Sequence, residues 1–412
     1  MQGARPVSGT DWWQVSIATL TNNFATGLAF GSFGTIILAM EKEYDASRAT
    51  SSLAISLMLV SLSLTAAILG RLIEKVSIRK VMLCGTLLGS LAFGLASVAR
   101  DATQLLAIYF VLLGPATAML GTLPSCTLAA RWATDDRRGL ALGIVNMPIM
   151  VMIVPLAIAP LLLADGIRAV YQALAVALLV FVPLVWFVRD RRGTSPADVA
   201  AIAAQAEIDL APTPPIMGSI FFWILVVGLG LLVGAGTMKL AHFVPLFTEQ
   251  GRTFEEANML LAVSGGAGLV GSFLFGALAD RIGGAKALML NALIQAVMWS
   301  VFLAPVGLPI LVVDAIVVGA CGAGAQAAFG VLLATLYGTK VFSRAFGLMA
   351  LFTLPFLFGL TPIASLLYEA SGSYHLPMGL MICGFVIAAT LFALLIKPER
   401  RRHIPIAEGD PT

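Results

Sequence analysis

Long apolar runs separated by short polar segments make up most of the chain. Many of these runs are long enough for a helix of about 20 residues, the length that crosses the hydrocarbon core of a bilayer. Dividing the sequence at clusters of charged residues, proline and glycine predicts twelve membrane-spanning helices. They lie at 13–40, 49–70, 78–99, 103–130, 139–164 and 170–188 in the first half, and at 219–247, 256–279, 286–304, 308–336, 345–368 and 375–396 in the second half.

The composition supports a membrane protein and excludes several other classes. Of 412 residues, 59% are hydrophobic and 11% are charged, whereas soluble domains carry about 25% charged residues. A soluble multidomain protein is therefore excluded, and so is a disordered chain, which needs low hydrophobicity and high charge. The net charge of +3 is small and its basic residues do not gather on one face, which disfavours nucleic acid as a partner. We expect an all-α protein embedded in a lipid bilayer.

The basic residues predict the orientation of the chain in the membrane. With the N-terminus inside, 19 of the 25 lysine and arginine residues fall in inside segments and five fall in outside segments. Cytoplasmic loops carry such an excess of basic residues. We therefore expect a multi-pass protein of the inner (plasma) membrane with both termini in the cytoplasm.

The two sets of six spans resemble each other. A glycine, an acid and a lysine at positions 70, 74 and 80 recur at positions 276, 280 and 286, an offset of 206 residues. Arg344 follows Arg138 by the same offset. A constant offset across two loops indicates internal duplication. We predict an N-terminal six-helix bundle at 1–188, a cytoplasmic linker at 189–218, and a C-terminal six-helix bundle with a cytoplasmic tail at 219–412. Helix-start signals within the linker predict a short surface helix over about 196–207.

The repeated loop carries a recognisable motif. After the eighth span, Gly276, Asp280 and Arg281 fit Gly-x-x-x-Asp-Arg-x-Gly-x-x-Lys, and the first copy has Arg71 with Glu74 in place of the aspartate. This pattern resembles the signature loop of the major facilitator superfamily. The resemblance implies the major facilitator fold, twelve helices in two six-helix bundles, and transport by alternating access. Because an acid can meet the positive N-terminus of another helix, these five residues are candidates for conformational gating.

Two shorter segments suggest a narrower group. The segment Arg131-Trp132 followed by 138–144, and the segment 242–245 at the end of the seventh span, resemble bacterial monocarboxylate and oxalate/formate-type carriers. That resemblance implies an organic anion as the substrate. Those carriers often place an arginine in the eighth span or a lysine in the eleventh, and this chain has neither.

Two charged residues lie within predicted spans, and a charged side chain at the centre of a span costs about 2.5–3.5 kcal/mol on insertion scales. Lys239 is about 9 Å and Asp314 about 12 Å from the middle of its span, toward the same side of the membrane, at about 1.5 Å per residue. The resemblance places spans 1, 4, 7 and 10 around a central cavity, so a Lys239–Asp314 pair is expected. His242 follows Lys239 by three residues, on nearly the same helix face. A static ion pair, or a lysine that snorkels to the membrane surface, would explain the charges without any function.

These charges suggest proton-coupled symport of a small organic anion, a monocarboxylate or an aromatic acid. Lys239 would bind the carboxylate, while Asp314 or His242 would carry the proton. The alternatives are proton-coupled efflux of drugs or amphipathic cations, which would use Asp314, and exchange of organic anions. The expected partners are therefore the anion and a proton, and we expect the protein to be a monomer.

Four neutral polar residues are weaker candidates for substrate binding. Asn22 and Thr26 share a face of the first span, Asn146 lies in the fifth, and Gln326 lies deep in the tenth. Amides in buried helices face a partner or a cavity. Hydrogen bonds between helices are the alternative role for all four.

The sequence offers no basis for an enzyme, a metal site or a cofactor. Its four cysteines are far apart and it has three histidines, so no metal-ligand spacing is present. A nucleophile–base pair is not visible either. The segment 266–271 fits GxGxxG but lies inside a predicted span, so close packing of helices explains it better than a dinucleotide.

Overall fold

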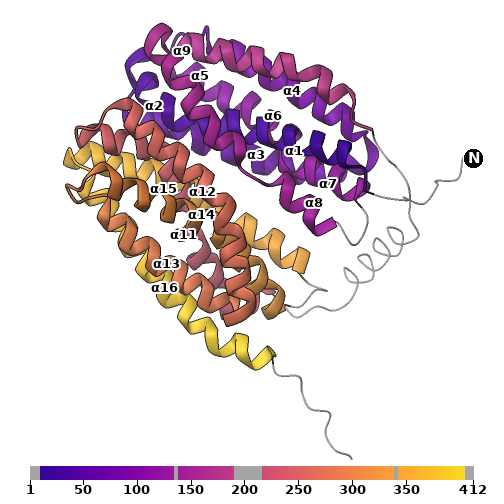
Figure 1. Ribbon diagram of the computed structural model, residues 1–412, viewed down its shortest axis with the longest axis vertical. Coiled ribbons are helices and arrows are strands. Elements are labelled where there is room, and N and C mark those ends of the chain that lie inside the picture. The colour runs from indigo at the N-terminus through magenta and orange to yellow at the C-terminus, as the bar shows by residue number, and fades with distance from the viewer. Residues whose placement is uncertain (1–9, 134–137, 190–215, 338–341, 404–412) are drawn as a thin grey trace, which may run out of the picture. The chain divides into compact units, whose positions relative to one another are not determined.

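The computed structural model describes residues 10–133, 138–189, 216–337 and 342–403 (Figure 1). These residues form helices and short connections, and no strand occurs among them. Eleven helical stretches within them are long and apolar enough to cross a membrane. The expected all-α class is therefore confirmed. The helix predicted over about 196–207 lies outside the described residues.

The helices follow the predicted spans closely. In the first half they are α1 (Trp12–Thr26), η1 (Gly27–Gly31), α2 (Ser32–Glu43), α3 (Arg48–Lys75), α4 (Ile78–Ala96), α5 (Ala102–Ile108), η2 (Tyr109–Leu113), α6 (Gly114–Leu120), α7 (Thr122–Trp132), α8 (Arg138–Val145) and α9 (Ile149–Trp186). In the second half they are η3 (Ile216–Gly218), α11 (Ile220–Glu249), α12 (Phe254–Ile282), α13 (Gly284–Val301), α14 (Leu308–Tyr337), α15 (Phe342–Ser371) and α16 (His375–His403).

Eleven stretches correspond to twelve predicted spans because α9 contains two helices. The stretch Ala141–Trp186 covers both the fifth and the sixth predicted spans. It is interrupted at Gly166, whose φ of 78° is non-helical. Glycine tolerates this left-handed conformation because it has no Cβ. The connection between the two spans is therefore a tight turn.

The chain forms two compact units that do not follow the predicted linker. The first unit contains Met1–Gly193, Thr237–Gly266 and Phe358–Gly372, and the remaining residues form the second. Parts of α11, α12 and α15 therefore pack with the first half of the sequence. The division of the chain at 189–218 rests on the repeat and stays a prediction.

Polar residues of α1 support a break between α8 and α9. Asn22 Nδ2 donates to the carbonyl of Val145 at 2.9 Å, and Asn23 Oδ1 accepts from the backbone N–H of Met150 at 3.0 Å. Pro148 lies in the break and has no N–H to continue the helix. The two asparagines thus satisfy backbone groups that the interruption leaves open.

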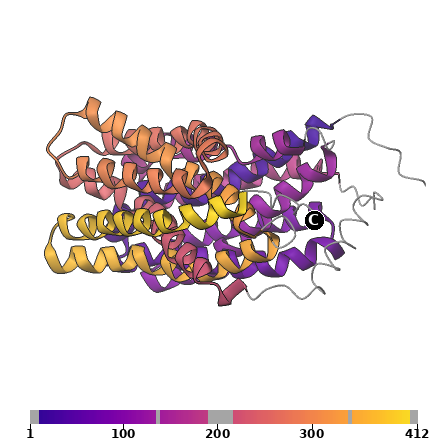
Figure 2. The same cartoon turned by 90° about the horizontal axis from the view of Figure 1, so that it is seen from below.

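In the second unit, small residues allow helices to approach closely. Helix α16, drawn in yellow, runs beside α13 (Figures 1 and 2). A Cβ at Gly271 of α12 would meet the backbone of Ala320 in α14, and a Cβ at Gly324 would meet the ring of Phe275. The packing role expected for the GxGxxG segment is confirmed at Gly271.

This packing predicts different effects for two glycine-to-alanine changes. Gly271→Ala should lower the free energy of unfolding by about 1–3 kcal/mol through overpacking. Gly322→Ala on α14 meets no atom within 4 Å and should raise it by up to about 1 kcal/mol. Melting temperatures of the two purified variants test this difference. Equal shifts would contradict the packing role of Gly271.

Candidate functional site

Lys239 lies within the apolar helix α11, ten residues before its C-terminal end. Its side chain is half-buried, and its Nζ donates to Ser264 Oγ on α12 at 3.0 Å. Ser264 itself is buried. The serine hydroxyl is a neutral acceptor for the ammonium group.

His242 of α11 contacts α15. The ring is 1% exposed, and its Nε2 lies 3.2 Å from both the carbonyl oxygen of Thr361 and Ser365 Oγ. Lys239 bonds to α12, so the two side chains are directed to different helices. His242 and Lys239 thus have different hydrogen-bond partners, although the sequence places them on nearly the same face of α11. Their spacing of three residues separates them by about 60° around the helix axis, which is enough to give them different neighbours.

Asp314 is buried in α14 and belongs to the second unit. Its side chain is 2% exposed, and neither carboxylate oxygen accepts a hydrogen bond from a described residue. Asp314 shares a helix face with Cys321 and Leu332, which follow it by 7 and 18 residues.

That shared face of α14 contacts α13. Asn291 Nδ2 of α13 donates to the carbonyl of Cys321 at 2.8 Å, and a Cβ at Gly284 would lie 2.7 Å from Leu332 Cβ. Asp314 therefore lies on the side of α14 that faces α13. Lys239 and Asp314 belong to different compact units, and the pair expected between them stays a prediction.

The four neutral candidates divide into two groups. Asn22 is buried and bonded to the end of α8, and Thr26 Oγ1 donates to the carbonyl of Asn22 at 2.8 Å. Both therefore have structural partners. Asn146 and Gln326 are exposed, so their amides remain accessible for binding. Asn146 Nδ2 also donates to the carbonyl of Leu142 at 2.9 Å.

The structure adds hydroxyl groups that sequence reasoning missed. Ser264 contacts Lys239, Ser365 contacts His242, and Thr361 Oγ1 donates to Thr237 Oγ1 at 3.2 Å. Serine and threonine are common in membrane helices, where they often bond to their own backbone. Nothing in the sequence distinguishes these hydroxyls from the others.

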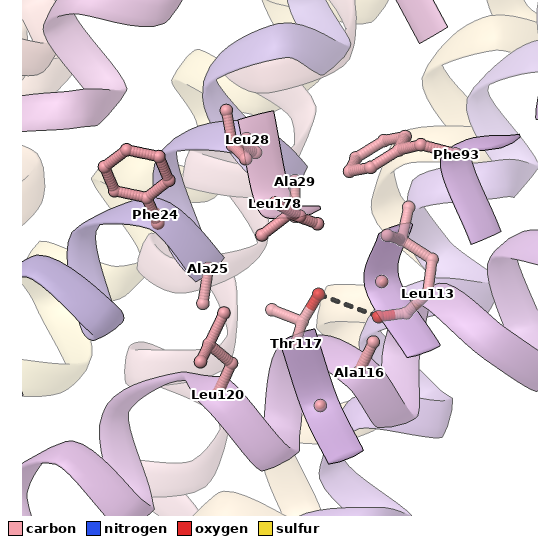
Figure 3. A pocket seen from close by; sticks show the side chains of 12 residues that line it. Phe24, Ala25, Leu28, Ala29, Phe93, Leu113, Ala116, Thr117, Leu120 and Leu178 are labelled. Atoms are coloured by element: carbon pink, nitrogen blue, oxygen red, sulfur yellow. Dashed lines mark hydrogen bonds between the residues drawn. The ribbon is translucent and has the colours of Figure 1, made fainter. Parts of the chain in front are cut away.

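A separate crevice in the first unit is apolar and small (Figure 3). Phe24, Leu28, Phe93 and Leu178 are among its lining residues, and Thr117 Oγ1 donates to the carbonyl of Leu113 within it. The crevice has room for about one water molecule. It is a packing gap, with no charged group among its lining residues.

The gating candidates are only partly described. Asp280 and Arg281 are exposed at the end of α12, near Gly276. The side chains of Arg71 and Glu74 lie outside the described residues.

A buried acid outside the repeated loop occupies the N-terminus of α13. Glu399 of α16 is 3% exposed, and its carboxylate accepts from the backbone N–H of Gly284 at 2.7 Å and of Ala285 at 3.1 Å. These N–H groups open α13, whose positive end favours the carboxylate. In the described residues, the C-terminal helix supplies this contact, which sequence reasoning missed.

Comparisons with known proteins agree with this helical architecture. The sequence model described as Major Facilitator Superfamily matches residues 19–255 and 230–411. A protein from Aspergillus terreus, the MFS-type transporter pytF, is 27% identical over 291 residues, which cover 68% of this chain and 92% of that protein.

Solved structures resemble the chain in fold alone. The D-xylose-proton symporter is 14% identical with a TM-score of 0.74, covering 92% of this chain and 97% of its own. A bacterial homolog of the human lysosomal transporter Spinster, in an inward-facing and occupied conformation, is also 14% identical with a TM-score of 0.74, covering 98% and 100%. The nucleoside transporter NupG is 13% identical with a TM-score of 0.69, covering 95% and 100%.

Proposed function

Because the chain belongs to the major facilitator superfamily of transporters, we propose that it moves a small organic anion together with a proton by alternating access. Lys239 is the observation that carries this proposal. It places a cation inside an apolar helix, beside the hydroxyl of Ser264. A carboxylate bound there would balance the charge and accept a charge-assisted hydrogen bond.

The energetics of burial favour an anionic ligand over a neutral one. A lysine in the middle of a span costs about 2.5–3.5 kcal/mol on insertion scales. A bound carboxylate adds a charge of opposite sign beside this ammonium group and accepts a charge-assisted hydrogen bond, whereas a sugar hydroxyl adds no charge. The surrounding apolar residues of α11 suit the hydrocarbon body of a monocarboxylate or an aromatic acid.

Asp314 would carry the proton. Its carboxylate is buried without a hydrogen-bond partner among the described residues, and a buried charge is costly unless it is paired. A proton on this group removes that cost, so the proton and the anion together enter the protein with little net charge. In this proposal Asp314 acts in the second unit, on the α13 side of α14.

The same carboxylate supports a second candidate function, efflux of an amphipathic cation. A lipophilic cation would pair with Asp314 as an ion of opposite sign. Lys239 would then have only the structural role of bonding α12. The two candidates differ in which variant does more harm, Lys239→Ala or Asp314→Asn.

We also propose the membrane setting that the basic residues predict. The protein would lie in the plasma membrane with both termini in the cytoplasm, and it would work as a monomer. In that orientation the end of α11 at Glu249 faces outward.

A thermal-shift screen of the purified protein tests the class of ligand. Lactate, para-hydroxybenzoate, D-xylose and tetraphenylphosphonium would each be added at about pH 5.5 and about pH 7.5. A ligand at 100 times its Kd stabilises the folded protein by about 2.7 kcal/mol. We expect stabilisation by a carboxylate, stronger at the lower pH. Stabilisation by tetraphenylphosphonium alone would contradict the anion proposal and favour cation efflux.

A further inference from the structure

Two buried amides form a hydrogen-bonded chain between α13 and α14 in the second unit. Gln295 Nε2 donates to Asn291 Oδ1 at 2.9 Å, and Asn291 Nδ2 donates to the carbonyl of Cys321 at 2.8 Å. A backbone carbonyl can only accept a hydrogen bond, so it fixes which way each amide is turned. Gln295 Oε1 is therefore the acceptor at the other end of this chain.

A tryptophan continues the same face of α13. Asn291, Gln295 and Trp299 follow one another at intervals of four residues, so they line one side of the helix. All three are buried, and the indole ring of Trp299 packs edge to face on Phe302 with ring centres 5.3 Å apart. The indole N–H is a donor and never an acceptor. This face of α13 thus presents an acceptor, Gln295 Oε1, and a donor, Trp299 Nε1, in successive turns.

Asp314 lies at the same depth as these two groups. A short connection joins α13 to α14, so the two helices run antiparallel. From the bond between Asn291 and Cys321, Gln295 and Trp299 lie about 6 Å and about 12 Å along α13, and Asp314 lies about 10 Å along α14 in the same direction, at about 1.5 Å per residue. The carboxyl group faces α13 between the levels of the amide acceptor and the indole donor.

We propose that Gln295 and Trp299 are positioning residues that hold Asp314 in its two charge states. Gln295 Oε1 accepts a hydrogen bond from the protonated carboxyl group, and Trp299 Nε1 donates one to the ionised carboxylate. Rotation of the Asp314 side chain exchanges these partners when the proton arrives or leaves. This assignment refines proton carriage by Asp314 and so rests on the proposed function.

Burial makes both charge states of Asp314 depend on a partner. Its two carboxylate oxygens are buried, and neither accepts a hydrogen bond from a described residue. An unpartnered polar group in such a place costs free energy, and an unpartnered charge costs more. A hydrogen bond to the charged form favours that form, and a bond made by the neutral form favours the neutral one. One acceptor and one donor together let the carboxyl group change its charge without leaving the protein interior.

The charged groups of the neighbouring helices lie away from Asp314. Helix α14 packs against α13 and α16 and approaches α12 at its glycines. The contacts of Gly284 with Leu332 and with Glu399 mark the opposite end of α14. That end holds the charged residues of these helices in the second unit, which are Asp280, Arg281, Lys286, Lys397 and Glu399. At the Asp314 end, α16 contributes His375 and Cys383, which are both exposed.

Infrared difference spectroscopy of the purified full chain tests the two roles. A titration between about pH 4 and about pH 9 follows the carbonyl band of protonated carboxyl groups, and subtracting the same titration of Asp314→Asn isolates the band of Asp314. Each variant is measured with the same subtraction in its own background. Gln295→Leu removes the acceptor and should lower the midpoint of this band by about one pH unit, whereas Trp299→Phe removes the donor and should raise it by about one pH unit.

A buried glutamine and a hydrogen-bonded tryptophan elsewhere in the chain provide matched controls. Gln14 is buried in the first unit, where its amide bonds to the backbone of Phe187 and Arg189. Trp223 Nε1 donates to the carbonyl of Met217 at 2.9 Å. Gln14→Leu and Trp223→Phe should both leave the midpoint of the Asp314 band unchanged.

The opposite signs separate the proposed roles from a general loss of packing. Variants that only loosen the contact of α13 with α14 would admit water, which favours the ionised form, so both midpoints would fall. Two shifts in the same direction, no shift in either variant, or the absence of a band that depends on Asp314 would overturn the assignment. Because the titration needs no ligand and no transport, a failure of carboxylates to bind would count against the proposed function and leave this test readable.

Discussion

Replacing Lys239 with alanine is expected to abolish the binding of carboxylates. The variant loses the one cation that α11 holds next to Ser264, and a bound carboxylate would be left buried without a charged partner. Truncating one member of a buried, hydrogen-bonded charge pair costs about 2–5 kcal/mol, so the Kd for the carboxylate found in the screen should rise by about 30-fold or more. Isothermal titration with the purified variant measures this change.

Two further variants separate the role of Lys239 from general effects. Lys42→Ala removes an exposed lysine at the end of α2 and should leave the Kd unchanged. Ser264→Ala keeps the charge and removes a neutral hydrogen bond, so the loss of affinity should be about tenfold or less. Unchanged carboxylate binding by Lys239→Ala would contradict the proposed anchor.

Asp314→Asn is expected to uncouple transport from the proton. Asparagine has nearly the same shape but takes up no proton, and it removes a buried acid that has no hydrogen-bond partner among the described residues. Accumulation of the carboxylate driven by a pH gradient should fall at least about tenfold in proteoliposomes, in line with the typical effect of removing a proton-transfer group. The Kd measured at equilibrium should change little, because Lys239 remains.

Asp165→Asn provides the control for this substitution. Asp165 is exposed beside the tight turn at Gly166, so its replacement should leave accumulation unchanged. Full pH-driven accumulation by Asp314→Asn would refute proton carriage by this residue. Loss of tetraphenylphosphonium binding in the same variant would instead support the cation-efflux function.

The membrane-spanning helices were predictable from the sequence because the lipid bilayer restricts which backbone structures can cross it. Every backbone polar group in a span must be bonded within its own helix, so spans read as apolar runs of nearly fixed length. Two runs that the sequence separates at 164–170 share one helical stretch in the structure, since the chain turns at Gly166 without a long loop. The hydropathy pattern shows that two spans are present, but it does not show how short the turn between them is.

The environment of each site residue was less predictable. Lys239 and His242 are three residues apart, yet they contact α12 and α15 respectively. A small angle around α11 decides between these neighbours, and it depends on how the helices pack. Contacts such as Ser52 with Ser365 depend on packing across 313 residues of sequence, which no local pattern reveals.

A similar limit applies to the polar residues that support helix ends. The sequence drew attention to Asn22 as a ligand-binding amide, whereas the structure bonds it to the carbonyl of Val145. Glu399 received no attention, although it caps the start of α13. Both residues satisfy backbone groups left open where a helix ends, and such needs are visible only after the helices are placed.

The most direct test of proton-coupled anion transport is proton movement driven by a carboxylate gradient. Purified protein in liposomes that contain a pH-sensitive dye would receive an inward gradient of the carboxylate that stabilised it, with protein-free liposomes as the reference for passive leak. The account predicts that the lumen becomes more acidic faster than in the reference, and that Lys239→Ala abolishes the difference. Equal acidification with and without the protein, or a response to tetraphenylphosphonium alone, would contradict it.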